Sequence, residues 1–210
     1  MHLESISSSA KKTLFRLKKS PLLDNFYLAG GTALALQIGH RKSEDFDWFT
    51  EKPLLKNLKS LLEKLFGDSL KPEIKNKEEL TSVLGGVKTT FFHYPFKLIY
   101  PTIDLNGFKL ASIREIALMK AFTLGQRAAL KDYVDLYFIF KSGIDINDIL
   151  KDIKIKYGEK YDIRMFLEQL VYLRDIDRQK ISFLQGEISI RQMERYFMSV
   201  VKAVKLDKKS

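Results

Sequence analysis

Two carboxylates, Asp45 and Asp47, are the residues whose type and spacing most directly suggest chemistry in this sequence. They lie in Asp45–Phe49 (DFDWF), where polar and apolar residues alternate with the period of a two-faced strand. Residues two apart on a strand point to the same side, so the carboxylates share one face and Phe46 and Trp48 take the other. Adjacent carboxylates repel each other, and a hard divalent cation compensates them naturally. A solvated acidic turn would explain the same pair without a ligand.

A glycine pair, Gly30 and Gly31, precedes Thr32 at the expected junction of a strand and a helix. Glycines let a phosphate group approach the backbone closely, and a helix N-terminus presents free N–H groups to anionic oxygen. Thirteen residues separate Gly31 from Asp45, which is room for one short helix and a turn. We therefore expect the glycine turn and the carboxylates to meet at one edge of a sheet.

Short elements must hold these groups in place, and the hydrophobic period and turn residues predict them. Phe26–Ala29 is the expected strand before the glycine pair, and Thr32–Ile38 is the expected helix after it. Gly-Gly at 85–86 and Asn-Gly at 106–107 are hairpin signals. The other expected elements are an N-terminal amphipathic helix with Leu3, Ile6, Ala10, Leu14 and Leu17 on one face, a helix over Pro53–Phe66, and strands near Leu80–Leu84 and Val87–His93.

Beyond Ala111 the apolar residues follow the period of α-helices almost to the end of the chain. Ser112 and Glu115 form a capping-box pattern at the start of this region. The expected helices are Ile113–Leu124, Ala129–Phe140, Ile146–Tyr157, Tyr161–Leu173 and Ile188–Val204. The predicted fold class is α+β, with a mixed sheet flanked by helices over residues 1–110 and a helical bundle over residues 111–210.

The composition excludes several classes of protein. The 210-residue chain has no cysteine, which excludes disulfides, Cys-ligated zinc and Cys nucleophiles. No apolar run reaches the roughly 18 residues of a membrane helix, and the N-terminus lacks the centre of a signal peptide, so we expect a cytoplasmic protein. The net charge of +10 is spread evenly, with 17 basic and 12 acidic residues in 1–110 and 19 and 14 in 111–210. This balance favours polyanions such as RNA or nucleoside triphosphates, although many Lys-rich proteins bind no nucleic acid.

The order of strand, Gly-Gly, helix and Asp-x-Asp resembles the signature of the polymerase β-like nucleotidyltransferases. The string GGTALALQIGHRKSEDFDWF resembles more narrowly the AbiEii/AbiGii toxin-type nucleotidyltransferases, which show Gly-Gly-Thr, His-Arg with a following Ser, and Asp-x-Asp. The resemblance implies a nucleotidyltransferase-type sheet whose active-site cleft is completed by the helical domain. It also implies Mg²⁺ or Mn²⁺ on Asp45 and Asp47, and phosphate binding by Gly30, Gly31, Thr32, Arg41, Ser43, Lys120 and Arg127.

A second region, Ser112–Phe140, is similar to the helical pattern of the same family. Lys120 and Arg127 are seven residues apart and share a helix face, and Asp132 and Asp135 share another. Solvated intrahelical ion pairs are the ordinary account of such charges. The resemblance instead implies that Lys120 neutralises triphosphate charge and that Asp135 orients Lys120 or contacts the acceptor, with the role of Asp132 left open.

One departure from the nucleotidyltransferase pattern concerns the general base. Many of these enzymes have a third carboxylate on a later central strand, and GVKTTFFHYPF takes that place here with Thr90 and no acid. Asp104 is a candidate substitute, but it adjoins the expected Asn-Gly turn. The general base is therefore unassigned: either Asp135 serves as the base, or the protein has weakened activity. We expect a local structural role for His40, at the end of the helix where positive charge suits the dipole.

The expected function is Mg²⁺-dependent transfer of a nucleotidyl group from a nucleoside triphosphate to an acceptor. The resemblance implies the toxin of a toxin–antitoxin or abortive-infection system, with RNA (tRNA) or protein as acceptor and an antitoxin protein as partner. The +10 charge favours RNA. The alternatives are a degenerate transferase that only binds nucleotide or RNA, and a plain helical interaction protein in which the Gly30–Asp47 spacing is coincidence.

Overall fold

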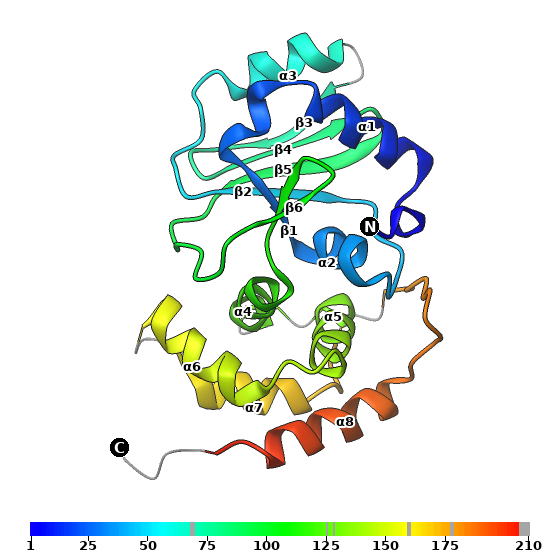
Figure 1. Ribbon diagram of the computed structural model, residues 1–210, viewed down its shortest axis with the longest axis vertical. Helices are drawn as coiled ribbons and strands as arrows, with labels where there is room; N and C mark the ends of the chain where they lie inside the picture. Colours follow the sequence, from blue (N-terminus) through cyan, green and yellow to red (C-terminus); the bar gives the residue numbers. More distant parts are fainter. Residues whose placement is uncertain (68–69, 125, 128, 159–160, 177–178, 206–210) are drawn as a thin grey trace. The chain divides into compact units, whose positions relative to one another are not determined.

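The computed structural model describes residues 1–67, 70–124, 126–127, 129–158, 161–176 and 179–205, without the side chains of residues 71–75. The chain divides into two compact units, residues 1–112 and 113–210 (Figure 1). The first unit contains a mixed sheet with helices and the second is helical in all its described regular elements, so the expected α+β class is confirmed.

The first unit is built on a seven-stranded sheet of order β3-β4-β5-β2-β1-β7-β6. The two strands that carry the predicted chemistry, β2 and its neighbour β5, run parallel, as do β1 and β7, and the other neighbouring pairs are antiparallel. The strands are β1 (Tyr27–Ala29), β2 (Phe46–Thr50), β3 (Leu70–Lys75), β4 (Glu79–Leu84), β5 (Val87–His93), β6 (Ile103–Leu105) and β7 (Phe108–Leu110).

Side chains alternate strictly between the two faces of β2. Phe46 and Trp48 are at most 1% exposed, whereas Asp47 and Phe49 are only partly buried. Helices α1 (Ser8–Lys18) and α3 (Leu58–Phe66) bury apolar faces in the same unit, and Figure 1 shows both over the sheet. Apolar burial therefore fixes the register of β2 and presents Asp47 on the face away from Trp48.

Two hairpins follow the predicted turn chemistry. Gly85 and Gly86 have φ of 56° and 84°, and Asn106 and Gly107 have φ of 56° and 76°. Positive φ at both central residues is the type I′ pattern, whose twist matches that of the flanking strands. The first turn joins β4 to β5 and the second joins β6 to β7, as expected.

The N-terminal helix was expected to include Leu3 and Ile6, but α1 begins at Ser8, where the Ser7 side chain accepts the Ala10 N–H; Leu3–Ser5 form a separate 3-10 helix and Ile6 is extended.

Two further expectations in this unit were wrong in detail. The helix expected from Pro53 begins at Leu58, because Leu58, Leu62 and Phe66 are buried whereas Leu55 is 46% exposed and has little to pack against. Strand β3 was not anticipated at all. It lies at the edge of the sheet and carries a register shift between Pro72 and Ile74, so it lacks the alternation of an inner strand.

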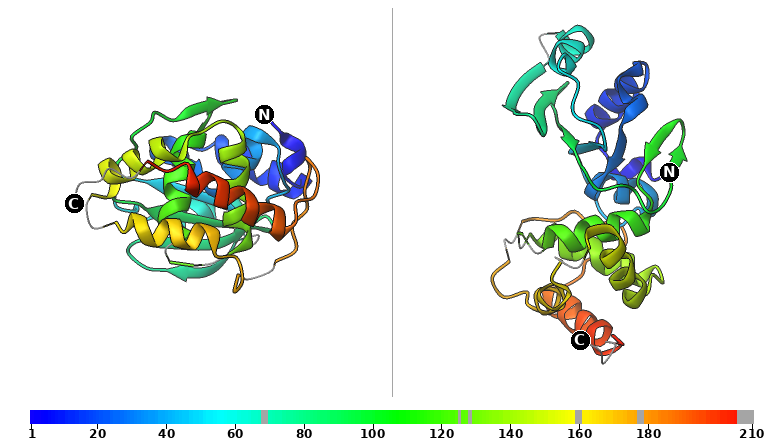
Figure 2. Two further views of the ribbon diagram at one scale, coloured as in Figure 1. Left: turned by 90° about the horizontal axis from the view of Figure 1, so that it is seen from below. Right: turned by 90° about the vertical axis from the view of Figure 1, so that its left-hand side faces the viewer.

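The second unit consists of α4 (Ile113–Leu124), α5 (Leu130–Lys141), α6 (Ile146–Tyr157), α7 (Ile163–Val171) and α8 (Ile190–Lys202). These bounds agree with the expected helices to within two residues at every end. Helix α4 packs against α5, α6 and α7, and α8 packs against α5 and α7 (Figure 2). Ser189 and Gln192 form a capping box at the start of α8.

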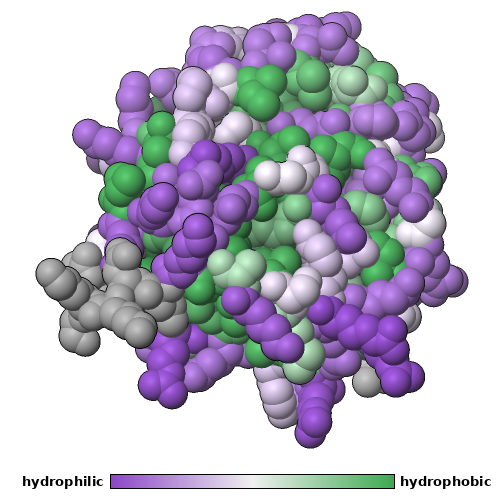
Figure 3. Space-filling model, turned by 60° about the horizontal axis from the view of Figure 1, so that its bottom comes forward, coloured by the Kyte–Doolittle hydropathy of each residue, from purple (hydrophilic) through white to green (hydrophobic). Residues whose placement is uncertain are grey.

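No helix among the described residues is long and apolar enough to cross a membrane. The helical unit nevertheless exposes several large apolar side chains, and Figure 3 shows apolar surface between hydrophilic side chains on one face of the molecule. Those of the helical unit are Ile155, Met165, Tyr172, Leu184 and Met198.

Candidate active site

The glycine turn and the second carboxylate are in direct proximity. Strand β1 ends at Ala29, which pairs with Asp47 on β2, and helix α2 (Gly30–Ile38) begins at the next residue. Gly30 has φ of +67°, and a methyl group added to it would lie 2.7 Å from the Asp47 carboxylate Oδ2. Only glycine therefore fits at this position, both for its backbone and for the space that Asp47 occupies.

The first carboxylate, Asp45, was expected on the strand with Asp47, but it lies one residue before β2, which begins at Phe46. Asp45 is exposed, and its backbone carbonyl accepts a hydrogen bond from the Thr32 hydroxyl in the first turn of α2. The Ser43 hydroxyl is 2.8 Å from the same Thr32 oxygen. Because Thr32 has a single O–H and uses it on Asp45, Ser43 is the donor in that second contact. Thr32 and Ser43 thus anchor the loop that brings Asp45 beside the glycine turn.

His40 and Arg41 are buried where α2 ends. Gly39 caps the helix in the left-handed conformation, with φ of 64°. His40 is 0% exposed and Arg41 is 3% exposed, and one Arg41 guanidinium nitrogen, Nη1, donates to the Lys42 carbonyl at 3.0 Å. His40 is thus part of the packed interior, and Arg41 lies within the loop that leads to Asp45.

Thr90 occupies the position beside Asp47 on the neighbouring strand. The parallel register of β2 and β5 pairs Asp47 with Thr90, which is 4% exposed. The Thr90 hydroxyl is 3.0 Å from the Thr81 hydroxyl on β4, and Thr81 donates to the Glu79 carboxylate at 2.7 Å. The residue paired with Asp47 on β5 thus carries a hydroxyl and no carboxylate. Its nearest acid in this chain of contacts is Glu79, reached through the Thr81 hydroxyl.

Asp104 is far from this position. It lies on β6, three strands from β2 in the sheet order, which corresponds to about 14 Å across the strands. Its carboxylate accepts the backbone N–H of Gly107 at 2.9 Å and stabilises the β6–β7 turn. The structure does not bring Asp104 together with Asp47.

A cluster of buried charges joins α4 to α5 in the helical unit. The Lys120 ammonium is 2.6 Å from Asp132 and 2.7 Å from Asp135, and the two carboxylates are 1% and 0% exposed. Arg127, whose side chain is 64% exposed, adds a 3.0 Å contact to the second oxygen of Asp132. Charges this deeply buried require partners, which these four residues supply to one another. Lys120 thus contacts both Asp132 and Asp135, and the role of Asp135 in orienting Lys120 for catalysis stays a prediction.

The carboxylate pair fits a divalent cation that is completed by its substrate. The described residues contain no group of three or more His, Cys, Asp or Glu side chains suited to holding a metal. Mg²⁺ is commonly held by one or two carboxylates, with substrate phosphates and waters supplying the remaining ligands. Asp45 and Asp47, next to the glycine turn, are a donor set of that kind.

Comparison with known proteins decides the family. The family model described as "Nucleotidyl transferase AbiEii toxin, Type IV TA system" matches residues 12–106 and 99–206, which is nearly the whole chain. This chain belongs to the AbiEii nucleotidyl transferase toxin family. An uncharacterised protein of Aquifex aeolicus (strain VF5) is 34% identical over 179 residues, covering 82% of this chain and 85% of the relative.

Solved structures share the fold of this AbiEii-family chain. MenT4, a nucleotidyltransferase toxin of Mycobacterium tuberculosis H37Rv, matches with a TM-score of 0.58 at 14% identity, over 95% of this chain and 87% of its own. A putative nucleotidyltransferase from H. pylori matches with a TM-score of 0.56 at 16% identity, over 92% of both chains. JHP933 from Helicobacter pylori matches with a TM-score of 0.53 at 16% identity, over 94% and 92%.

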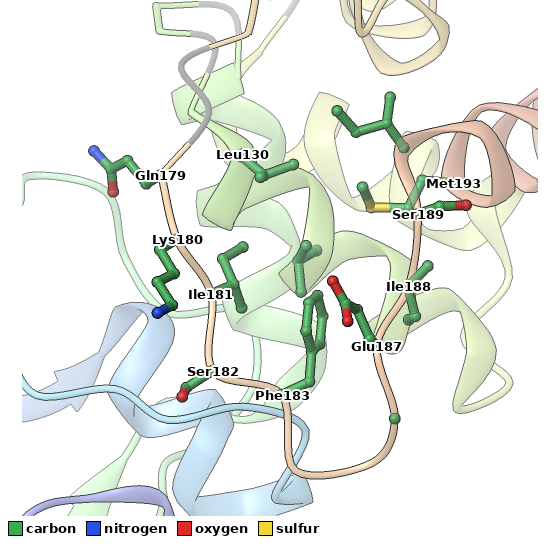
Figure 4. Close-up of a pocket in the computed structure, with 13 residues that line it drawn as sticks. Leu130, Gln179, Lys180, Ile181, Ser182, Phe183, Glu187, Ile188, Ser189 and Met193 are labelled. Atoms are coloured by element: carbon green, nitrogen blue, oxygen red, sulfur yellow. The ribbon is translucent and has the colours of Figure 1, made fainter.

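A pocket in the helical unit is lined by none of the residues predicted to act in this AbiEii-family chain. It has a volume of about 590 Å³ between α5, the start of α8 and the connecting segment 179–189. Figure 4 shows apolar side chains such as Leu130, Ile181 and Phe183 around it, with Lys180 and Glu187 on the connecting segment.

Sequence reasoning missed the partners of Thr90, although a signal for them exists. A two-residue Gly85-Gly86 turn pairs residues whose numbers sum to a constant, which places Thr81 opposite Thr90. Glu79 and Thr81 then point to the same face of β4, and the buried Leu80 between them points to the opposite face. Counting outward from the hairpin turn would have found both.

Proposed function

We propose that this chain transfers a nucleotidyl group from a nucleoside triphosphate to an RNA acceptor, with tRNA as the first candidate. The observation that carries the proposal is the proximity of Gly30 and Asp47, because it joins a phosphate-binding turn to a metal-binding carboxylate. The family supports nucleotidyl transfer and a toxin role. The net charge of +10 supports a polyanionic acceptor over a protein.

In this proposal Asp45 and Asp47 hold Mg²⁺ or Mn²⁺, which neutralises charge on the reacting phosphate. The Gly30–Gly31 turn at the start of α2 binds the triphosphate through backbone N–H groups. Thr32 and Ser43 act by holding Asp45 in place, since their hydroxyls are engaged there. The products are the nucleotidylated acceptor and pyrophosphate.

The basic residues of the proposed site fall into two groups. We assign Lys120 to triphosphate charge, oriented by Asp135 and Asp132, and Arg127, which is largely exposed, to the same anion. We assign Arg41, in the loop before Asp45, to phosphate binding. A cytoplasmic location and control by an antitoxin protein follow from the proposed toxin role and remain predictions.

A labelling assay tests the proposal. Purified protein is incubated with each radiolabelled nucleoside triphosphate, Mg²⁺ and total tRNA, beside an Asp47→Ala variant and a chelator control. We expect label on RNA with at least one nucleotide, and its loss in the variant and with chelator. No labelled product with any of the four nucleotides, on either RNA or protein acceptors, would contradict it.

A degenerate transferase is the second candidate, and one observation favours it. The position paired with Asp47 on β5 holds Thr90, so no acid stands directly beside the metal-binding carboxylate on that strand. Calorimetry separates the two functions. Triphosphate binding that is independent of Mg²⁺ and survives the double change Asp45→Ala and Asp47→Ala would favour a module that binds without catalysis.

A further inference from the structure

A chain of three hydrogen-bonded side chains leads from Thr90, the cross-strand neighbour of Asp47, to the Glu79 carboxylate. Thr81 donates its hydroxyl proton to Glu79 at 2.7 Å, and the Thr81 and Thr90 hydroxyl oxygens are 3.0 Å apart. These residues come from β4 and β5, and β5 lies between β4 and β2 in the sheet (Figure 1). The contacts therefore connect a carboxylate to the position next to the candidate metal-binding carboxylate.

Strand register places all four side chains on one face of the sheet. Asp47 pairs with Thr90, and Thr90 pairs with Thr81, so these three lie in one row across successive strands. Glu79 is two residues from Thr81 on β4 and projects to the same side. Two strand spacings separate β4 from β2, which is about 10 Å. Glu79 is therefore too far from Asp47 to take a proton there without intermediates.

The hydroxyl protons of this chain have one direction. A threonine hydroxyl has a single proton, and an ionised carboxylate only accepts. Because Thr81 uses its proton on Glu79, Thr90 is the donor in the 3.0 Å contact with Thr81. Thr90 has no second proton to donate, so its remaining lone pair is an acceptor. An acceptor oxygen beside Asp47 suits a group that receives the proton of an attacking hydroxyl.

Burial encloses the inner part of the chain and leaves its end open. Thr81 is 1% exposed and Thr90 is 4% exposed, whereas Glu79 is partly exposed. Linked hydrogen bonds polarise one another, and they do so more strongly where water is excluded. A proton that enters at Thr90 can thus leave the protein at Glu79.

A structural role alone explains only part of this arrangement. Cross-strand threonine pairs stabilise many sheets, but such a pair requires neither a carboxylate at its end nor Asp47 beside it. Thr89, the preceding residue on β5, shows the contrast. It is 0% exposed on the opposite face, and its hydroxyl donates to the Val87 carbonyl on its own strand. Thr89 is therefore a matched control for the loss of a buried hydroxyl.

We propose that Thr90, Thr81 and Glu79 form a proton relay that serves as the general base of the transfer. This rests on the proposed function. The acceptor oxygen bonds to the α-phosphorus while the bond from that phosphorus to the bridging oxygen breaks, and pyrophosphate leaves with the electron pair. The acceptor proton passes to Thr90, directly or through one water. At the same time the Thr90 proton moves to Thr81 and the Thr81 proton to Glu79, which returns a proton to solvent.

Single-turnover transfer at saturating triphosphate tests the relay with paired variants. Thr90→Ser keeps the hydroxyl and should transfer at a rate close to that of the wild type. Thr90→Val and Glu79→Gln interrupt the chain, and each should lower the rate about 100-fold without weakening triphosphate binding, as expected for loss of a positioned base. Thr89→Val should leave the rate unchanged. Thermal denaturation verifies that every variant folds.

Combined variants separate a relay from independent structural effects. Glu79→Gln added to Thr90→Val should cause no further loss, because the chain is already interrupted. Thr90→Asp places a carboxylate at the entrance of the chain, so its rate should be insensitive to Glu79→Gln. A proton inventory in mixtures of H₂O and D₂O should be curved for the wild type, in which several protons move together, and linear for Thr90→Asp.

Two results would overturn the relay. These are losses that multiply in the double variant Thr90→Val and Glu79→Gln, and equal transfer rates in Thr90→Ser and Thr90→Val. Either result, obtained beside a wild type that transfers nucleotides, would contradict the relay alone. Absence of transfer by the wild type would contradict the proposed function and the relay with it.

Discussion

At the scale of single residues, the candidate site depends on the close contact between Gly30 and the Asp47 carboxylate. Gly30 combines a left-handed backbone with a carboxylate oxygen in the space where a Cβ would be. The two constraints have different origins, since the first is set by the turn from β1 into α2 and the second by the register of Asp47. They can be separated by comparing this glycine with another that has only the first constraint.

Gly30→Ala is expected to slow transfer strongly while the protein stays folded. The methyl group would displace the Asp47 carboxylate, and a shift of about 1 Å at a reacting centre costs on the order of 100-fold in rate. Gly86→Ala is the matched control, because Gly86 has φ of +84° and nothing within 4 Å of the added methyl. The labelling assay and thermal denaturation should show similar stability losses but very different activities. Equal activity in the two variants would contradict this assignment.

The buried charge cluster of the helical unit makes a second prediction at this scale. Lys120→Met leaves the two carboxylates of Asp132 and Asp135 buried beside each other, with Arg127 contacting only Asp132. Removing one partner from such a cluster destabilises a protein by about 3–5 kcal/mol. Arg127→Met, at a side chain that is 64% exposed, should cost less than about 1 kcal/mol. Urea denaturation measures both, and a small loss for Lys120→Met would show that the cluster does not depend on this ammonium.

At the scale of elements, backbone pairing and buried hydroxyls determine which groups meet. The register of β2 with β1 and β5 brings Asp47 to Ala29 and Thr90, and no local sequence preference specifies those partners. In the helical unit the Tyr133 hydroxyl on α5 donates to the carbonyls of Gln169 and Tyr172 at the end of α7, at 3.1 and 3.3 Å. Burial, followed by the nearby charge of Asp132, raises the pKa of Tyr133 from 10.0 to about 12.

This raised pKa predicts a loss of stability in alkaline solution. The unfolded chain loses the Tyr133 proton near pH 10 and the folded chain near pH 12, so the stabilisation is complete below pH 10 and falls as the pH rises toward 12. Tyr133→Phe removes this titration. The free energy of unfolding of the wild type should therefore fall more steeply than that of the variant between these pH values, in denaturation series at fixed ionic strength. Parallel pH profiles would show that the hydroxyl titrates normally.

At the scale of the whole molecule, charge is distributed and does not form a tail. The 17 basic and 12 acidic residues of 1–110 leave an excess of five, and the 19 and 14 of 111–210 leave the same excess. Such a distribution acts over a distance of about a Debye length, near 10 Å at 0.1 M salt. Both parts of the chain would therefore attract RNA electrostatically, independently of its base sequence.

RNA binding should consequently weaken with salt. Displacing counterions from single-stranded RNA gives a slope of about −0.7 per neutralised phosphate in a plot of log affinity against log salt, so a few contacts predict about a tenfold loss between 50 and 200 mM salt. Fluorescence anisotropy with a short labelled single-stranded RNA measures it. Affinity independent of salt would argue for an uncharged acceptor.

The sequence by itself determined the local elements and the chemistry they carry. Hydrophobic period and turn residues were sufficient for the two hairpins and for the helices from α4 to α8, because these follow from contacts close in sequence. The edge strand β3 and the first residue of α3 were not predicted, because they depend on packing partners elsewhere in the unit. The Gly30–Asp47 segment also predicted the family, which the family model confirmed. Its residue types and spacing are those that phosphate and metal binding require.

The sequence predicted that the glycine turn and the carboxylates meet, but only the tertiary structure decided their other neighbours. Strand pairing placed Thr90 beside Asp47 and Asp104 on the edge strand β6, three strands away. Helix packing brought Lys120 to Asp132 and Asp135. These are contacts between separate elements, set by apolar burial on the opposite faces of strands and helices. The residues that make them carry no local mark of their partners.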